Sequence, residues 1–137
     1  MERSDLTVLD DPRAVARHVA AWLVEKLNTG VKRGRGVCLS GGATPRLLYE
    51  TLAQRPYSEA MPWQRIHWFW CDERWVPHTD ERSNYNMTRH QLFSRAPIPN
   101  KNIHAIPTQR GSPIEAAAAY ERELKRFYGA GALNADR

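Results

Sequence analysis

The sequence predicts an α/β fold in which a parallel sheet carries helices on both of its faces. Apolar runs of strand length alternate with amphipathic segments of helix length along the chain. Two of those runs, 36–40 and 65–71, end abruptly in glycine or charged residues, as strands do where their carboxyl ends meet a ligand. The 137 residues contain no internal repeat, low-complexity segment or linker, so we expect a single domain over 1–137.

The first helix is predicted from a local start signal and an apolar stripe. Asp11 can accept a hydrogen bond from the first turn, and Pro12 suits the first helical position. The Asn-Thr-Gly sequence at 28–30 should end this helix. Helical spacing places five apolar residues on one face, which we expect to be buried: Val15, Val19, Trp22, Leu23 and Leu27.

A strand, a helix and a second strand should follow in that order. The strand at 36–40 breaks into Ser-Gly-Gly, and a helix should run from Pro45 to about Gln54 with Thr44 as its N-cap. Aromatic and β-branched residues alternate over 65–71, which is typical of a central strand.

Three further elements complete the alternation. Ser83 can cap a helix that runs to about Ser94, and 103–106 can form a short strand. Ser112 and Glu115 have the spacing of a capping box, which opens a last helix. The apolar face of that helix consists of Tyr120, Leu124, Phe127 and Tyr128.

Several residues on these elements should belong to the core. Cys38 and Cys71 fall on predicted strands, and no Cys-x-x-Cys occurs, so we expect reduced, buried thiols rather than a disulfide or a metal pair. His67 should be a buried histidine whose hydrogen bonds are satisfied. The tryptophans are expected in the core rather than on a platform for stacking bases: Trp63, Trp68, Trp70 and Trp75.

The first candidate binding motif is Ser-Gly-Gly-Ala-Thr at 40–44. Where a strand turns through glycines into a helix, free N–H groups and the positive end of the helix dipole favour an anion, most often a phosphate. Gly41 and Gly42 allow the backbone to approach the ligand, and the hydroxyls of Ser40 and Thr44 can add hydrogen bonds. The alternative is an ordinary strand-to-helix turn. No Gly-x-x-x-x-Gly-Lys and no complete dinucleotide fingerprint occurs in the sequence.

The second candidate motif is Asp72-Glu73-Arg74, directly after the predicted strand 65–71. Ligands of open α/β sheets bind beyond the carboxyl ends of the strands, so this motif and 40–44 should face one another across one crevice. Asp72 and Arg74 are the candidate catalytic residues, whereas the neighbouring Glu73 should point the opposite way.

Each of these polar residues also has a structural alternative. Asp72 can cap the loop after the strand, and Arg74 can pair with Glu73 or Asp80. Asn84 is a candidate substrate contact, or simply an early residue of its helix.

Together the motifs resemble the 6-phosphogluconolactonase family, whose superfamily includes the glucosamine-6-phosphate isomerases and deaminases. The resemblance covers roughly residues 8 to 137. It rests on four segments in the order and at the spacing of the family: Ser-Gly-Gly-Ala-Thr-Pro (40–45), Phe-Trp-Cys-Asp-Glu-Arg (69–74), Ser-Asn-Tyr-Asn-Met (83–87) and Pro-Ile-Pro-Asn-Lys-Asn-Ile-His (97–104). The isomerases and deaminases usually continue Asp-Glu with Tyr, so Arg74 favours the lactonase branch.

This resemblance implies a three-layer α/β sandwich of the sugar-phosphate isomerase/lactonase type. It also implies hydrolysis of 6-phosphogluconolactone to 6-phosphogluconate in the pentose phosphate route, with no cofactor and no metal. The phosphate would be anchored at 40–44. Arg74 would stabilise the developing oxyanion or clamp the substrate, and Asp72 would orient substrate hydroxyls or a water molecule.

The sequence departs from the family in one respect. The family's catalytic histidine lies in a later Asp-Gly-His segment, which these 137 residues lack, and its members are considerably longer. We therefore expect a domain truncated before its C-terminal strands, with little or no lactonase activity and a strand edge that favours self-association. Two other functions stay open: an amino-sugar-phosphate isomerase or deaminase with Asp72 as its base, and a non-catalytic phosphosugar-binding half-domain.

The composition of the chain argues against two classes of partner, nucleic acids and membranes. The net charge of +5 does not indicate nucleic acid, because the basic residues are spread along the chain and the dense cluster at 32–35 lies in a predicted loop. No run approaches the ~20 apolar residues of a membrane span, and 1–5 lacks the apolar core of a signal peptide. We expect a cytoplasmic protein whose partner is a small sugar phosphate, neither a nucleic acid nor a membrane.

Overall fold

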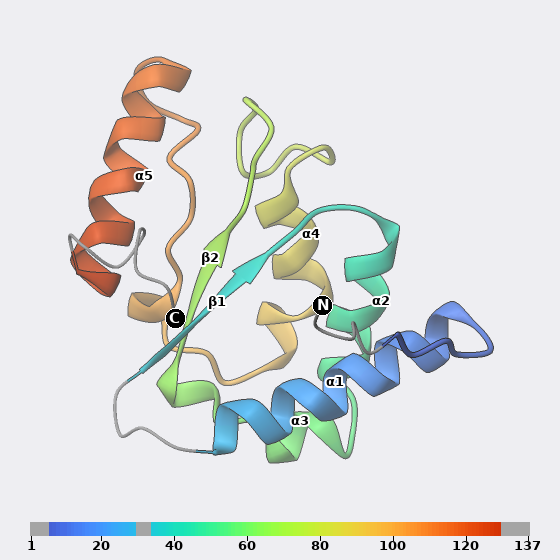
Figure 1. Cartoon of the computed structure of the whole chain (residues 1–137). Helices are drawn as coiled ribbons and strands as arrows, with labels where there is room; N and C mark the ends of the chain where they lie inside the picture. The colour runs from blue at the N-terminus through green and yellow to red at the C-terminus, as the bar shows by residue number, and fades with distance from the viewer. Residues whose placement is uncertain (1–5, 30–33, 130–137) are drawn as a thin grey trace.

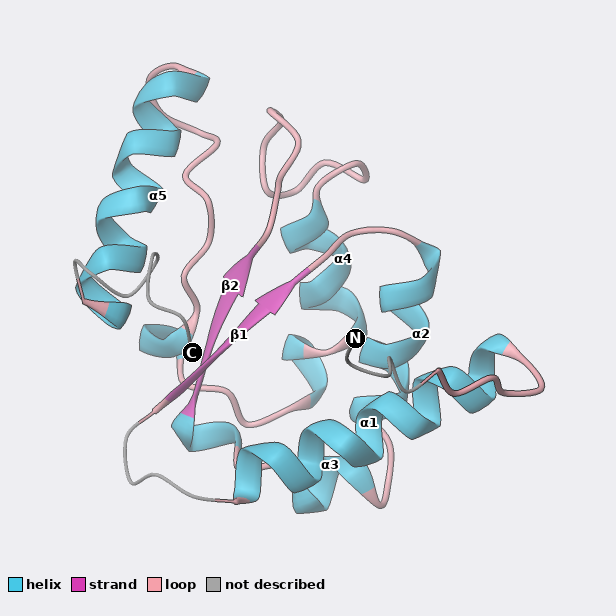
Figure 2. Cartoon of the chain, in the orientation of Figure 1, coloured by secondary structure: helices cyan, strands magenta, loops and turns pink. Residues whose placement is uncertain are grey.

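The sheet of the computed structural model contains two parallel strands, β1 (Arg35–Leu39) and β2 (Ile66–Trp70). The structure describes residues 6–29 and 34–129. The register runs from Arg35 opposite Ile66 to Leu39 opposite Trp70, and Ile103 adds a parallel bridge to Trp68. The two strands cross the middle of the molecule, with the helices on either side of them (Figures 1 and 2).

Five α-helices and three short 3-10 turns surround these strands. The helices are α1 (Pro12–Asn28), α2 (Ala43–Leu52), α3 (Tyr57–Ala60), α4 (Asn84–Gln91) and α5 (Pro113–Tyr128). The 3-10 turns are η1 (Trp63–Arg65), η2 (Phe93–Arg95) and η3 (Asn100–Asn102). The alternation of strands and helices confirms the predicted α/β class with a parallel sheet.

Three of the predicted helix starts are confirmed by side-chain caps. Asp11 accepts a hydrogen bond from the Ala14 amide at 2.7 Å and begins α1, with proline in the first turn. Ser83 caps α4 in the same way. At α5 the capping box is complete, because Ser112 and Glu115 each accept from the backbone of the other.

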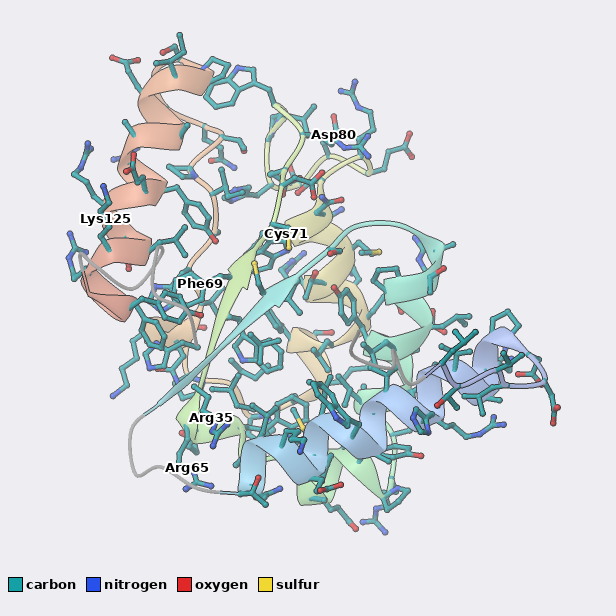
Figure 3. The ribbon with its side chains drawn as sticks, in the orientation of Figure 1. Arg35, Arg65, Phe69, Cys71, Asp80 and Lys125 are labelled. Carbon is teal, nitrogen blue, oxygen red and sulfur yellow. The ribbon has the colours of Figure 1, made fainter. Side chains whose placement is uncertain are left out.

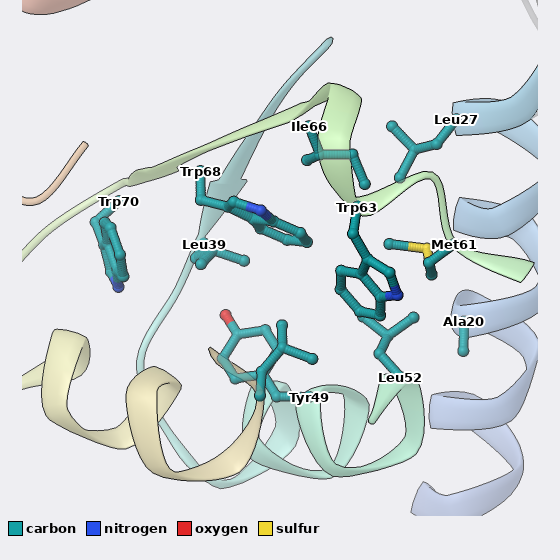
Figure 4. Close-up of a cluster of buried hydrophobic side chains, with 11 residues drawn as sticks. Ala20, Leu27, Leu39, Tyr49, Leu52, Met61, Trp63, Ile66, Trp68 and Trp70 are labelled. Carbon is teal, nitrogen blue, oxygen red and sulfur yellow. The ribbon is translucent and has the colours of Figure 1, made fainter. Parts of the chain in front are cut away.

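Helices cover both faces of the strands because successive side chains of a strand point to opposite sides. On one face, Trp68 and Trp70 of β2 pack with residues of α1 and α2 (Figure 4). On the other face, the ring of Phe69 lies 5.1 Å from that of Phe127 on α5. The core cluster of the first face consists of Ala20, Leu27, Leu39, Tyr49, Leu52, Met61, Trp63, Ile66, Trp68, Trp70 and Leu92.

A tyrosine hydroxyl fastens α5 to the strands. Tyr120 Oη accepts from the Trp70 amide at 2.7 Å and donates to the carbonyl of His104 at 3.0 Å. Burial raises the pKa of Tyr120, so the hydroxyl keeps the proton that it donates. The last turn of α5 lies tightly against β1, since a Cβ on Gly36 would be 2.8 Å from Cζ of Tyr128.

Several predicted boundaries are wrong. Thr44 is not the N-cap of α2: the helix begins at Ala43 after Gly42, whose φ of +106° turns the chain earlier than expected. The helix predicted to about Ser94 leaves α-geometry after Gln91 and ends in η2. Instead of a strand at 103–106, a single bridge forms at Ile103.

The predicted burial is wrong at several apolar positions. Val15 and Trp22 on α1 are 38% and 52% exposed, because α1 turns its small residues Ala16 and Ala20 toward the core. Trp75 is 44% exposed, because it lies in the loop beyond β2. Cys38 and Cys71 are also exposed, because they lie where the two strands end, with Cys71 one residue beyond β2.

His67 is partly buried and hydrogen-bonded, as expected of a satisfied histidine. Its Nδ1 lies 2.8 Å from Nε2 of His104, whose own Nδ1 lies 2.7 Å from a carboxylate oxygen of Glu123 on α5. The predicted end of α1 at 28–30 is confirmed, because the helix ends at Asn28 and Thr29 is its C-cap. Gly30 and the basic positions 32–33 lie outside the described residues.

Candidate functional site

A buried tyrosine of α2 makes two hydrogen bonds to the backbone of the loop after β1. Tyr49 Oη, on α2, accepts from the Ser40 amide at 3.0 Å and donates to the Ser40 carbonyl at 2.7 Å. Burial raises the pKa of Tyr49 to about 12, so the hydroxyl remains protonated and can make both bonds at neutral pH. The backbone at the carboxyl end of β1 is thus fixed before the glycines begin.

The two glycines of this loop meet different requirements. Gly42 has a φ of +106°, which residues with a side chain rarely adopt, and it leads directly into α2. Gly41 lies against Asn84 at the start of α4: a Cβ on Gly41 would overlap the amide oxygen and lie 2.6 Å from its Cγ. The glycine at 41 therefore permits a close approach of the two segments.

Asn84 joins this loop to the end of β2. Its Nδ2 donates to the Asp72 carbonyl at 3.1 Å and to the Asp72 carboxylate at 3.3 Å. The side chain of Asn84 is buried, whereas Asp72 is exposed. The loop after β1, the end of β2 and the start of α4 therefore meet at one buried amide.

Glu73 acts as a structural cap for α4. Its carboxylate accepts from the Ser83 hydroxyl at 3.0 Å, from the Asn84 backbone N–H at 2.7 Å and from the Tyr85 backbone N–H at 2.9 Å. A carboxylate at a helix N-terminus satisfies free N–H groups and interacts favourably with the helix dipole. The same carboxylate accepts from the Arg74 backbone N–H at 2.8 Å, while the side chains of Asp72 and Arg74 remain exposed.

A polar cavity of about 340 Å³ lies between the start of α2 and the loop before α4. Residues of both predicted motifs line it, together with arginines from three segments: Gly42, Ala43, Arg46, Arg74, Glu81, Arg82, Ser83, Asn84 and Met87.

The three arginines of the cavity differ in whether they are paired with a carboxylate. Arg82 is paired with Asp80, with guanidinium-to-carboxylate distances of 2.8 and 2.9 Å. These bonds hold the pKa of Asp80 at about 2. The guanidinium groups of Arg46 and Arg74 form no ion pair with any other residue that the structure describes. Among the described residues, the cavity therefore holds two unpaired guanidinium groups beside one unpaired carboxylate, that of Glu81, and this positive balance favours an anion.

The structure separates the predicted phosphate-binding residues into two groups. Gly42, Asn84 and Arg74 line the polar cavity, and Gly41 and Asp72 lie next to it through Asn84. The side chains of Ser40 and Thr44 instead border an apolar groove of about 260 Å³ between α1, β1 and α2.

Two residues of the site were not predicted from the sequence. Arg46 lies in the first turn of α2 and lines the cavity; a basic residue one position after Thr-Pro was the available signal. Tyr49 lies about one turn after Arg46 on α2. Its position in the sequence predicts only a buried helix residue, and not the hydrogen bond that its hydroxyl makes to Ser40.

The remaining titratable groups lie outside the cavity. His78 places Nε2 2.8 Å from the Ile106 carbonyl and stacks on Tyr85. Within 6–29 and 34–129, no group of three or more His, Cys, Asp or Glu side chains is arranged to hold a metal ion. None of the helices in these ranges is both long and apolar enough to cross a membrane.

Similar sequences belong to sugar-phosphate enzymes. The profile of the family described as Glucosamine-6-phosphate isomerases/6-phosphogluconolactonase matches residues 10–136. A 6-phosphogluconolactonase of Nostoc sp. is 39% identical over 128 residues, covering 92% of this chain and 52% of that protein. One from Haemophilus influenzae is 47% identical over 91 residues, covering 66% of this chain and 36% of its own length. The chain thus spans about half the length, or less, of these curated relatives.

Solved structures give the same result. The crystal structure of 6-phosphogluconolactonase from Thermotoga maritima matches with a TM-score of 0.73 at 37% identity, over 88% of this chain and 53% of that one. A monomeric glucosamine-6-phosphate deaminase matches with a TM-score of 0.75 at 14% identity, over 86% of this chain and 48% of that one. At that identity the second match shows the fold alone.

Proposed function

The chain belongs to the glucosamine-6-phosphate isomerase/6-phosphogluconolactonase family, and from this membership we propose that it binds a sugar phosphate at the carboxyl ends of β1 and β2. The reaction that it serves is hydrolysis of 6-phosphogluconolactone to 6-phosphogluconate, in the pentose phosphate route. The observation that carries this proposal is the polar cavity with the unpaired guanidinium groups of Arg46 and Arg74.

The phosphate would lie at the start of α2. The first N–H groups of a helix have no partner within the helix, and Gly42 leaves the approach to them open. Arg46 and Arg74 flank this position and can neutralise a dianion. Ser40, Gly41, Thr44 and Asn84 complete the proposed substrate-binding set. The buried side-chain amide of Asn84 holds the two loops together, whereas Ser40 and Thr44 border the neighbouring apolar groove and would contribute their hydroxyls from there.

In the hydrolysis, a water oxygen attacks the lactone carbonyl carbon, the bond from that carbon to the ring oxygen breaks, and the ring oxygen takes up a proton. Arg74 can stabilise the negative charge that develops on the carbonyl oxygen, and the exposed carboxylate of Asp72 can orient substrate hydroxyls or the water. The family's histidine base belongs to an Asp-Gly-His segment that is absent from these 137 residues. We propose that a second polypeptide segment supplies this base.

The same proposal accounts for the open side of the sheet. β1 pairs with β2 on one edge, and the apolar groove between α1, β1 and α2 runs beside it. Further parallel strands of a three-layer sandwich of the isomerase/lactonase type would continue the sheet here, from the rest of a longer chain or by self-association. A cytoplasmic location is part of the proposal, which cell fractionation would test.

Calorimetric titration with 6-phosphogluconate, with gluconate as the phosphate-free control, tests the binding step. We expect 6-phosphogluconate to bind the 137-residue chain, and Arg74→Met or Arg46→Met to weaken binding about tenfold or more. Arg55→Met is the matched control, since Arg55 forms an exposed ion pair with Glu59 on α3. Equal affinity for gluconate, or unchanged affinity in both arginine variants, would contradict the proposal.

Turnover separates the lactonase from the other two functions. With no general base in place, we expect the chain alone to hydrolyse fresh 6-phosphogluconolactone ~10² to 10⁴-fold more slowly than its full-length relatives. Release of ammonia or formation of fructose 6-phosphate from glucosamine 6-phosphate would identify an isomerase or deaminase instead. Binding without any turnover, even after addition of the second half of a relative, would identify a phosphosugar-binding module.

A further inference from the structure

The two cysteines lie side by side at the carboxyl end of the sheet. Cys38 is on β1, Cys71 directly follows β2, and their sulfur atoms are 3.3 Å apart. Both residues are exposed. Figure 3 shows Cys71 at the end of β2, where the strand leads into the loop that carries Asp80.

The strand register explains why these sulfurs meet. Cys38 pairs with Phe69, so the side chains of Cys38, Phe69 and Cys71 lie on the same face of the sheet. The ladder continues one residue beyond β2, because the Cys71 amide donates to the Leu39 carbonyl at 2.9 Å. Both thiols are therefore held by paired backbone rather than by mobile loops, and their proximity is a property of the fold.

We propose that Cys38 and Cys71 form a reversible redox pair, which peroxide oxidises to an intramolecular disulfide beside the candidate binding site. In the first step a thiol loses its proton, the thiolate sulfur attacks one peroxide oxygen and the O–O bond breaks. A sulfenic acid forms, and the departing hydroxide takes up the released proton to give water. In the second step the other thiol attacks the sulfenic sulfur, the S–S bond forms, and the hydroxyl leaves as water with the thiol proton. Overall, the two thiols lose two electrons and two protons, and one hydrogen peroxide becomes two water molecules.

The surroundings of Cys38 favour one order of these two steps. Desolvation of Cys38 against the sheet, together with the adjacent Cys71 sulfur, raises the pKa of Cys38 to about 12. Because the thiolate is the nucleophile, this shift makes Cys38 slow to attack peroxide, and we expect Cys71 to attack first and Cys38 to resolve the sulfenic acid.

Closure of the disulfide acts directly on the candidate site. An S–S bond is ~2.05 Å long, so the sulfurs must approach each other by roughly 1.2 Å from their present 3.3 Å. Cys71 immediately precedes Asp72, and its sulfur lies 3.7 Å from the Ser40 hydroxyl. Displacements of about 1 Å at a binding site are sufficient for large losses of function. We therefore expect the oxidised form to bind 6-phosphogluconate at least tenfold more weakly than the reduced form.

Intact mass spectrometry of the reduced chain after a hydrogen peroxide titration tests the chemistry. These are the two cysteines of the sequence. We expect a monomer that has lost the mass of two hydrogen atoms, has no thiol reactive toward Ellman's reagent, and recovers both thiols with dithiothreitol. A peptide map without reduction should contain the Cys38 and Cys71 peptides joined. Persistent free thiols, over-oxidation of one sulfur, or disulfide-linked dimers would overturn the proposal.

Serine variants test the order and the consequence. In Cys38→Ser, the Cys71 sulfenic acid should accumulate and react with dimedone, whereas in Cys71→Ser the remaining thiol should react much more slowly. If Cys38→Ser reacts no faster than Cys71→Ser, the assigned order is wrong; circular dichroism first establishes that both variants fold.

The last experiment compares the affinity of the oxidised and the reduced protein for 6-phosphogluconate, and it rests on the proposed function. Weakened binding that dithiothreitol restores supports the proposal, and equal binding by both forms refutes the coupling to the site. If the disulfide forms but neither state binds the ligand, the proposed function fails while the redox pair stands.

Discussion

The amide of Asn84 donates to the carbonyl and the carboxylate of Asp72, at 3.1 and 3.3 Å. Through this contact the buried start of α4 holds the exposed end of β2. The same side chain lies so close to Gly41 that a methyl group at 41 would overlap it. The relative placement of both sequence motifs therefore depends on one buried amide, and this dependence can be measured.

Replacement of Asn84 by alanine should release Asp72 and leave the Asp72 carbonyl without this donor. We expect 6-phosphogluconate affinity to fall about tenfold and the free energy of unfolding to fall by about 1–3 kcal/mol. Asn86→Ala in the same helix is the matched control, because the Asn86 amide makes only a 3.5 Å contact with the Thr79 carbonyl. Equal losses in both variants would argue against a positioning role for Asn84.

Gly41→Ala should disrupt the site by overpacking. The new methyl group would lie 2.6 Å from Cγ of Asn84, and such overlaps in packed regions cost about 1–3 kcal/mol. In the Gly41→Ala/Asn84→Ala double variant the overlap is absent, so the second substitution should cost less than it does alone. Urea unfolding of the four proteins gives the coupling energy, and strict additivity would contradict the predicted contact.

Removal of the Glu73 carboxylate should destabilise the fold rather than only the site. The Glu73→Ala variant loses the acceptor of the Ser83 hydroxyl and of two amides at the start of α4, and we expect a loss of about 2–4 kcal/mol. Glu59→Gln, which removes one partner of an exposed ion pair, should cost less than about 1 kcal/mol. Both values can be obtained from denaturant unfolding followed by tryptophan fluorescence. A loss for Glu73→Ala no larger than that for the control would show that the cap is not important.

Stability should decrease in mildly acidic solution because of His67. Desolvation, followed by the nearby His104 and Lys101, lowers the pKa of His67 below its ordinary value of 6.5. The folded state thus binds the proton more weakly than the unfolded state, so the contribution of His67 is present above about pH 6.5 and is lost as the pH falls through its folded pKa. Lys101 faces His67 from η3, and Glu123 on α5 reaches it through His104.

Unfolding curves at several pH values between 8 and 5 test this prediction. The free energy of unfolding should decrease below pH 6.5 in the wild type and decrease less steeply in His67→Asn. Parallel pH profiles for the two proteins would assign the acid sensitivity to other groups.

The helix starts at Asp11, Ser83 and Ser112 were predictable because each cap is a contact between residues three positions apart. The start of α2 was not, because the positive φ of Gly42 competed with the hydroxyl of Thr44, and nothing in the order of residues decides between them. The strands were predicted to within a residue at either end from their apolar alternation.

The residue sequence by itself determined the α/β class, the two strands with their polar ends, and the family. It did so because apolar periodicity, capping and the Ser-Gly-Gly and Asp-Glu-Arg motifs are local properties. The tertiary structure alone decided that Glu73 caps α4, that Arg46 faces the cavity, and that Cys38 and Cys71 touch while exposed. These relationships join residues far apart in the sequence, 33 positions in the case of Cys38 and Cys71. Their distances depend on strand register and helix packing, which the residue pattern constrains only weakly.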